Sequence, residues 1–221
     1  MKMEKKEVTG WDFLSLALIA FGGLGMEVLY AYFLEPMIYG AGMGEWTTGQ
    51  TLSHWTLTCL TWGAFGWYVI RTAKKDCGFD LLEAGKNMRA WQWAVIFAAV
   101  LLTLGMSYAS WDGFKVILEF QRNGAPKFVF QYIYYLFETL LFSLIIILGQ
   151  KAFETWFHRK NIPYGGILCG LTWGLAHIFT KGSIATGLGG LLLGFLMGSA
   201  YLLVNRDSRK AYLVLCLMFI L

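Results

Sequence analysis

The chain has 221 residues, of which 57% are hydrophobic and 14% are charged, and its formal net charge is +4 at pH 7. Soluble domains carry about 25% charged residues, so this composition excludes a domain that water surrounds on every side. The four cysteines are scattered, without a CxxC pair or a zinc-binding spacing, and we interpret them as structural thiols.

Long, predominantly apolar runs recur along the chain. A hydrocarbon core takes about 20 apolar residues per helical span. The sequence therefore predicts an all-α fold, a polytopic transmembrane helical bundle that forms one domain over residues 1–221. It has six full spans plus a short C-terminal seventh segment, in chain order 11–34, 52–70, 91–109, 127–149, 163–180, 184–204 and 211–221. Between the third and fourth runs, "FKVILEF" (114–120) has the apolar spacing of an interfacial helix.

Basic residues are distributed unevenly over the connections. When the connections alternate between two sides, fourteen Lys and Arg residues fall on the side of the N-terminus and four on the other, namely Lys115, Arg122, Lys127 and Lys181. Cytoplasmic loops carry an excess of Lys and Arg, so the N-terminus is predicted to be cytoplasmic, in the plasma membrane of a prokaryote. The basic residues lie in short loops, so membrane lipid and not nucleic acid is the expected partner.

Glycines recur every four residues in the fifth and sixth runs. Such GxxxG patterns let two helix backbones approach closely. The sequence predicts that these two helices pack tightly against each other through Gly166, Gly170, Gly174, Gly190, Gly194 and Gly198.

Four ionisable side chains fall inside the apolar runs: Glu27, His54, Glu138 and His177. A charged group at the bilayer centre costs about 2.5–3.5 kcal/mol on insertion scales, so each one is a functional candidate. Glu138 lies thirteen residues before Lys151, and His177 lies fourteen residues after Pro163.

At helical rise, both side chains lie roughly 20 Å from the same face of the membrane. Consecutive antiparallel helices can bring them opposite each other, so we expect a shared polar site. Structural hydrogen bonding of each residue to its neighbours is the alternative.

Residues around this pair are expected to support it. Tyr134 and Tyr135 lie four and three residues before Glu138, on the same helix face. Glu27, roughly 24 Å from the inner end of its helix, could join the site or be a packing acid. His54 lies close to the outer end of its run, where an interfacial role is the alternative.

These residues resemble the CAAX prenyl protease and bacteriocin-processing (CPBP, or Abi) family of intramembrane proteases. "ETLLFS" (138–143) stands where that family has EExxxR, and "WGLAH" (173–177) stands where it has FxxxH. "GLGGLLLGFLMGSAYL" (187–202) is similar to the helix that follows in the family. The resemblance covers about residues 125–221.

The resemblance implies that Glu138 activates a water and that His177 orients this water or polarises the scissile carbonyl, with Trp173 in the place of the motif's Phe. Thr139 and Ser143 stand where the family has Glu and Arg, so both charges are replaced by hydroxyls. The family's third motif pairs His with Asn, and neither residue type follows Asn205 here.

Three functions are open on these grounds. The first is an endopeptidase that acts on membrane-embedded or lipid-modified peptides. The second is a scaffold that binds such a peptide or a partner protein without cleaving it. The third is a transporter in which Glu138 and His177 relay protons. No nucleotide cofactor is implied, and a divalent metal is left open. Because a catalytic zinc normally has three protein ligands, Glu27 or His54 would have to complete such a site.

Overall fold

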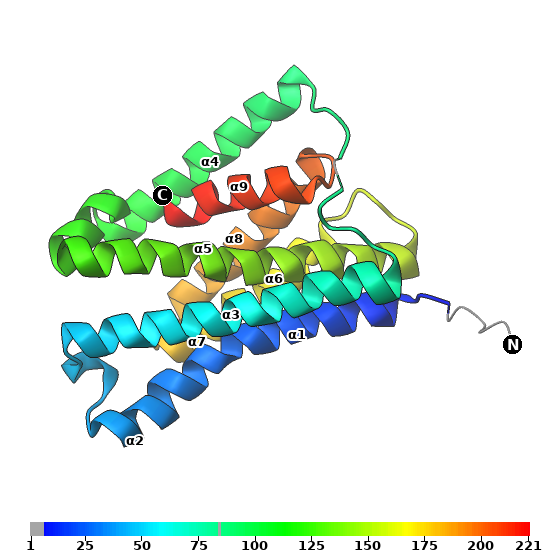
Figure 1. Ribbon diagram of the computed structural model, residues 1–221. Coiled ribbons are helices and arrows are strands. Elements are labelled where there is room, and N and C mark those ends of the chain that lie inside the picture. Colours follow the sequence, from blue (N-terminus) through cyan, green and yellow to red (C-terminus); the bar gives the residue numbers. More distant parts are fainter. Residues whose placement is uncertain (1–6, 84) are drawn as a thin grey trace, which may run out of the picture.

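The computed structural model describes residues 7–83 and 85–221, and every regular element within them is helical (Figure 1). The elements are α1 (Gly10–Leu29), η1 (Tyr30–Leu34), α2 (Glu35–Tyr39), η2 (Met43–Glu45), α3 (Thr48–Cys77), α4 (Ala90–Trp111), α5 (Lys115–Phe157), α6 (Tyr164–Cys169), η3 (Gly170–Gly174), α7 (Leu175–Lys181), α8 (Ile184–Leu203) and α9 (Ser208–Ile220). Of these, η1 and η3 are π-helical turns within otherwise continuous helices, and η2 is a short 3₁₀ turn. The all-α prediction is thereby confirmed for the described residues.

Polar residues at the helix starts explain where several helices begin. Before α1, the backbone N–H of Thr9 donates to Oδ2 of Asp12 at 2.8 Å, and before α3 the N–H of Thr47 donates to Oε1 of Gln50 at 2.8 Å. These reciprocal contacts occupy amide groups that have no partner inside the helix. α3 ends at Cys77, and the next residue, Gly78, has a φ of 64° and caps the helix in the left-handed conformation.

A single glycine divides α5 into two parts. Gly124 has φ 67° and ψ 170°, which is not helical, and Pro126 follows it at the start of the longer part. The residues before Gly124 include the segment expected as an interfacial helix, and this segment is helical. Its side chains Lys115 and Glu119 contact the helix that follows, so it folds back on the bundle.

The longer part of α5 lies at the centre of the molecule. α5 contacts α1, α3, α6 and α9, and Figure 1 shows α1, α3 and α5 running side by side while α8 crosses behind them and α4 diverges from the bundle. All residues of α5 from 141 to 150 are buried. A carboxylate on this helix is therefore surrounded by protein.

Among the described residues, four helices are long and apolar enough to cross a membrane: Gly10–Tyr39, Ala90–Trp111, Lys115–Phe157 and Ile184–Leu203. The six full spans expected from the sequence are therefore not confirmed. α3 has sufficient length, but its Thr and Gly residues and its Lys-rich end lower its hydropathy. Four glycines and His177 do the same for the helix of α6, η3 and α7. α9 has 13 residues and corresponds to the short seventh segment.

The two glycine series meet as their spacing predicts. A Cβ added at Gly166 would lie 2.6 Å from the carbonyl oxygen of Gly194, and one at Gly174 would lie 2.6 Å from that of Gly190. At these distances no side chain fits between the backbones of α6, η3 and α8. The helix that carries Trp173 and His177 is therefore held firmly against α8.

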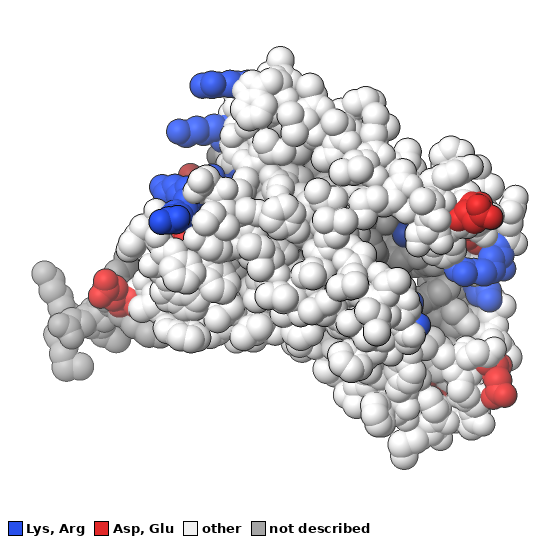
Figure 2. Space-filling model, turned by 180° about the vertical axis from the view of Figure 1, so that it is seen from behind, with Lys and Arg blue, Asp and Glu red and all other residues white. Residues whose placement is uncertain are grey.

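Charged side chains lie at the two ends of the molecule. Figure 2 shows Lys, Arg, Asp and Glu at both ends of the visible face and a broad band without charge between them. The end opposite the N-terminus is hollowed in this view, and basic side chains lie in the hollow. This distribution fits a bundle whose middle faces hydrocarbon.

Candidate functional site

Glu138 and His177 are connected through Trp173, which lies between them. The indole Nε1–H of Trp173 donates to Oε1 of Glu138 at 2.9 Å. Nδ1 of His177 lies 2.8 Å from the backbone carbonyl oxygen of Trp173, and the two rings are 4.8 Å apart. The pair expected from the sequence is thus brought together from α5 and α7, with an indole as the shared partner instead of a direct contact.

The hydrogen bond of His177 fixes which ring nitrogen carries the proton. A carbonyl oxygen accepts and cannot donate, so Nδ1 of His177 must be the donor. In the neutral imidazole, Nε2 then has a free lone pair and acts as an acceptor. His177 is half-buried while Glu138 is buried, so the imidazole is the more accessible of the two groups.

Glu27 lies on α1, and its carboxylate faces Nε2 of His54 and the hydroxyl of Tyr134. Tyr134 packs its ring on Trp62 at 4.7 Å between centroids, which holds the hydroxyl in place. The Glu27 side chain is 32% exposed, so the site reaches the surface on this side.

His54 is buried within the bundle. Its side chain is 2% exposed, and Nδ1 lies 2.6 Å from Oε2 of Glu35. Nε2 points toward Glu27, 3.9 Å from Oε1. Glu35 directly follows the π-helical turn η1, just beyond the end of the apolar run drawn from the sequence, and for that reason the sequence analysis missed it.

The hydroxyls at the two altered motif positions do not bond to each other. Thr139 donates to the backbone carbonyl of Tyr135 at 2.8 Å, one helical turn earlier. Oγ of Ser143 is buried and has no hydrogen-bond partner among the described residues. Tyr135 donates its hydroxyl to Oε1 of Glu119 at 2.6 Å.

Glu119 is the centre of a second polar cluster that the sequence analysis missed. It is fully buried and also accepts from Gln131 at 3.0 Å and from Tyr132 at 3.1 Å. This cluster exists because the chain reverses at Gly124 and lays one part of α5 on the other. The Gly and Pro around position 125 signalled that reversal, but they did not show which side chains it would bury.

Lys115 is buried beside both clusters. Its side chain is 7% exposed, and Nζ donates to the backbone carbonyl of Phe219 in α9 at 3.0 Å. Nζ lies 4.5 Å from the ring centroid of Tyr135, and it acts electrostatically on Glu119 and Glu138. A cation from the polar connection between the third and fourth runs therefore lies in the protein interior.

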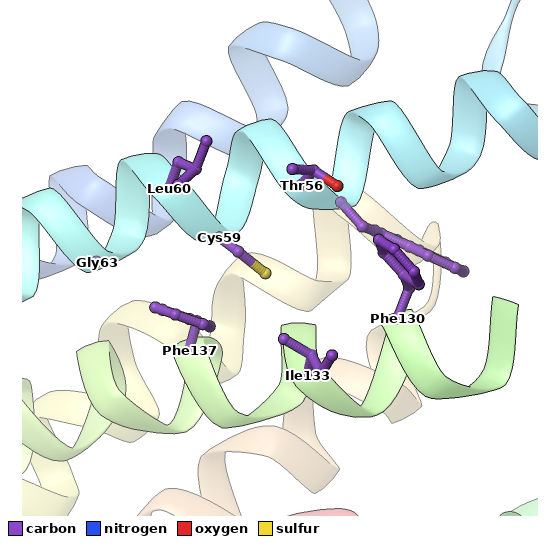
Figure 3. A pocket seen from close by; sticks show the side chains of 8 residues that line it. Thr56, Cys59, Leu60, Gly63, Phe130, Ile133 and Phe137 are labelled. Atoms are coloured by element: carbon purple, nitrogen blue, oxygen red, sulfur yellow. The ribbon is translucent and has the colours of Figure 1, made fainter. Parts of the chain in front are cut away.

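An apolar hollow of about 420 Å³ adjoins the site between α3 and α5. Figure 3 shows Cys59 and Leu60 from α3 and Phe130, Ile133 and Phe137 from α5 around it. Trp55 also lines the hollow, and its ring is 6.4 Å from that of Tyr134. Tyr134 therefore lies close both to this hollow and to Glu27.

Within residues 7–83 and 85–221, no group of three or more His, Cys, Asp and Glu side chains is placed to hold a metal ion. Comparison with protein-family models, with curated proteins and with solved structures finds no match for this chain.

Proposed function

We propose that the chain is an intramembrane endopeptidase, similar to the CAAX prenyl protease and bacteriocin-processing family, that uses water activated by Glu138. The observation that carries this proposal is the bond from Trp173 to Glu138 together with the bond from His177 to the Trp173 carbonyl. These two contacts connect a carboxylate and an imidazole acceptor through one tryptophan, which supports a shared site.

The chemistry follows from the two acceptors. The free carboxylate oxygen of Glu138 takes a proton from a bound water, and Nε2 of His177 accepts a hydrogen bond from the same water and orients it. The water oxygen then attacks the scissile carbonyl carbon, as in general base catalysis. Glu138 later gives the proton to the leaving amine.

The substrate class is a membrane-embedded or lipid-modified peptide. The hollow between α3 and α5 is lined almost entirely by apolar and aromatic side chains, and Trp55 connects it to Tyr134. Such a surface takes an apolar chain better than a hydrated one. The partially exposed Glu27 gives the peptide backbone a polar approach to the site.

The same proposal places the chain in a prokaryotic plasma membrane, with a cytoplasmic N-terminus and six crossings. Support comes from the fourteen-to-four division of basic residues and from the uncharged band between the two charged ends. α3 then crosses in contact with α1 and α5, and the helix of α6, η3 and α7 crosses in contact with α5 and α8.

A scaffold without turnover is the second candidate. It is favoured by the altered motif positions, because Thr139 uses its hydroxyl within its own helix and Ser143 finds no hydrogen-bond partner in the described part of the chain. On this account, the hollow and the site bind a membrane-embedded peptide or partner protein and release it unchanged.

The test is cleavage of a peptide library by the protein reconstituted in lipid vesicles. We expect cleavage by the wild type and its loss in Glu138→Gln, with Glu45→Gln as the matched control because Glu45 is exposed in the turn before α3. Binding of peptides without cleavage, unchanged by Glu138→Gln, would support the scaffold instead.

A further inference from the structure

The proposed hydrolysis leaves one requirement that Glu138 and His177 do not meet. When water adds to the scissile carbonyl, its oxygen becomes an oxyanion, and a hydrogen-bond donor must be in place to stabilise it. Ionised Glu138 is an acceptor. Neutral His177 uses its one N–H on the Trp173 carbonyl, so its remaining nitrogen is also an acceptor.

Lys115 has the donors that are missing. An ammonium group carries three N–H donors. The hydrogen bond of Nζ goes to the neutral carbonyl of Phe219, which leaves two further N–H donors on the ammonium group. The nearby carboxylate of Glu119 is occupied by donors from Gln131, Tyr132 and Tyr135.

The packing around Lys115 places this cation near the general base. Nζ lies 4.9 Å from the ring centroid of Phe219. That ring packs on Trp173 at 5.5 Å, and Trp173 donates to Glu138. Lys115 and Glu138 are both buried, and the packed rings of Phe219 and Trp173 lie between their contacts.

We propose that Lys115 is a catalytic residue that stabilises the oxyanion formed during peptide hydrolysis. This inference rests on the proposed function. Lys115 reaches the site from the segment before Gly124 and binds the backbone carbonyl of Phe219, which lies 104 positions later in α9. The proposed site therefore draws on α5, η3, α7 and the segment before Gly124.

Each atom of the step is accounted for. The water oxygen bonds to the carbonyl carbon, and the proton from water passes to Glu138. The electron pair of the C=O bond moves to its oxygen, and Lys115 donates hydrogen bonds to that oxygen. Reformation of the C=O bond then breaks the C–N bond, and the amine leaves with the proton from Glu138.

The experiment compares Lys115→Met, Lys115→Arg and the control Lys127→Met in lipid vesicles, using a peptide that the wild type cleaves. Lys115→Met should lower kcat by about 10²–10³-fold with little change in KM, because an oxyanion donor acts mainly in the transition state. Lys115→Arg, which keeps the charge and the donors, should recover part of the rate. Lys127→Met should behave as the wild type.

A phosphinate analogue of the same peptide gives a second measurement. Its charged oxygen imitates the oxyanion, so its inhibition constant should rise in Lys115→Met by about the same factor as kcat/KM falls. The affinity of Glu138→Gln for the uncleaved peptide should be unchanged when Lys115→Met is added.

The outcomes separate this inference from the proposed function. If cleavage depends on Glu138 and Lys115→Met retains the wild-type kcat, the role of Lys115 is wrong and the peptidase stands. If Lys115→Met raises KM and weakens peptide binding without changing kcat, Lys115 binds the substrate and does not stabilise the oxyanion. If the wild type cleaves no peptide, both are wrong.

Discussion

The indole N–H of Trp173 holds Oε1 of Glu138 at 2.9 Å, and this contact decides how the buried carboxylate is oriented. The sequence placed Glu138 and His177 at matching depth because helical rise converts residue count into distance. It could not show that Trp173 would lie between them, since side-chain direction depends on how α5 and η3 pack. Lys115 was hidden for a similar reason, because its burial requires the reversal at Gly124.

Trp173→Phe should destabilise the protein by about 1–3 kcal/mol, because it leaves a buried acceptor on Glu138 without its donor. Phe keeps an aromatic ring beside Phe142 and Phe219 but lacks the pyrrole ring of the indole, so lost packing adds to the cost of the lost hydrogen bond. The free energy of unfolding in mixed micelles measures the effect. Trp93→Phe on the exposed face of α4 is the matched control and should be neutral. Equal stability of the two variants would contradict the role given to Trp173.

At the scale of elements, the sequence predicted the positions of the helices well and their membrane status less well. Length and apolar content locate α1, α4 and α8 because each one is uniformly apolar. α3 and the helix of α6, η3 and α7 also have the expected positions. Their glycines and polar residues lower their hydropathy, so neither is among the helices apolar enough to be identified as a span. The close contact of the glycine series was predictable because a four-residue spacing places them on one helix face.

Gly198→Ala should destabilise the protein by about 1–3 kcal/mol, because its Cβ would overlap the backbone of Gly166 and force α6 and α8 apart. Gly189→Ala is the control in the same helix, where an added Cβ meets nothing within 4 Å. That control should be neutral or stabilising by up to about 1 kcal/mol through helix propensity. Thermal unfolding of both variants in detergent distinguishes them.

Asp207 fixes the start of α9 to the connection between α3 and α4. Oδ1 accepts from the backbone N–H groups of Arg209 and Lys210, and Oδ2 accepts from Nζ of Lys210 at 2.9 Å and from the Gly85 N–H at 3.0 Å. Burial by itself raises the pKa of Asp207, but the hydrogen bonds from Lys210 and Gly85 outweigh it and lower the pKa to about 2.

Because its folded pKa lies below the ordinary value of 3.8, ionised Asp207 stabilises the fold above about pH 4. This contribution, at most about 2 kcal/mol, should disappear as the pH falls from about 4 to about 2. Asp207→Asn keeps a capping side chain but does not titrate. The stability difference between wild type and Asp207→Asn should therefore shrink over this pH range, and a constant difference would contradict the assignment.

For the whole molecule, the proposed orientation in a membrane rests on the fourteen-to-four division of basic residues and on the uncharged band between the two charged ends. If α3 crosses the membrane as proposed, Lys75→Cys should react with an impermeant maleimide from the cytoplasmic side and Glu45→Cys from the outer side. Both positions are exposed and flank α3. Labelling of both from one side would exclude the crossing of α3, and a reversed pattern would exclude a cytoplasmic N-terminus.

The π-helical turn η3 has a consequence for how the site is encoded. Each residue advances an α-helix by about 100°, and a π turn holds one residue more than an α turn. Deletion of the exposed Leu171 would let this turn become an ordinary α turn. The positions of Trp173 and His177 would then be rotated relative to α5 and α8. Every side chain of the site would still be present, yet the imidazole and the carboxylate would no longer share a partner. Residue count in this turn therefore specifies the site as much as residue identity does.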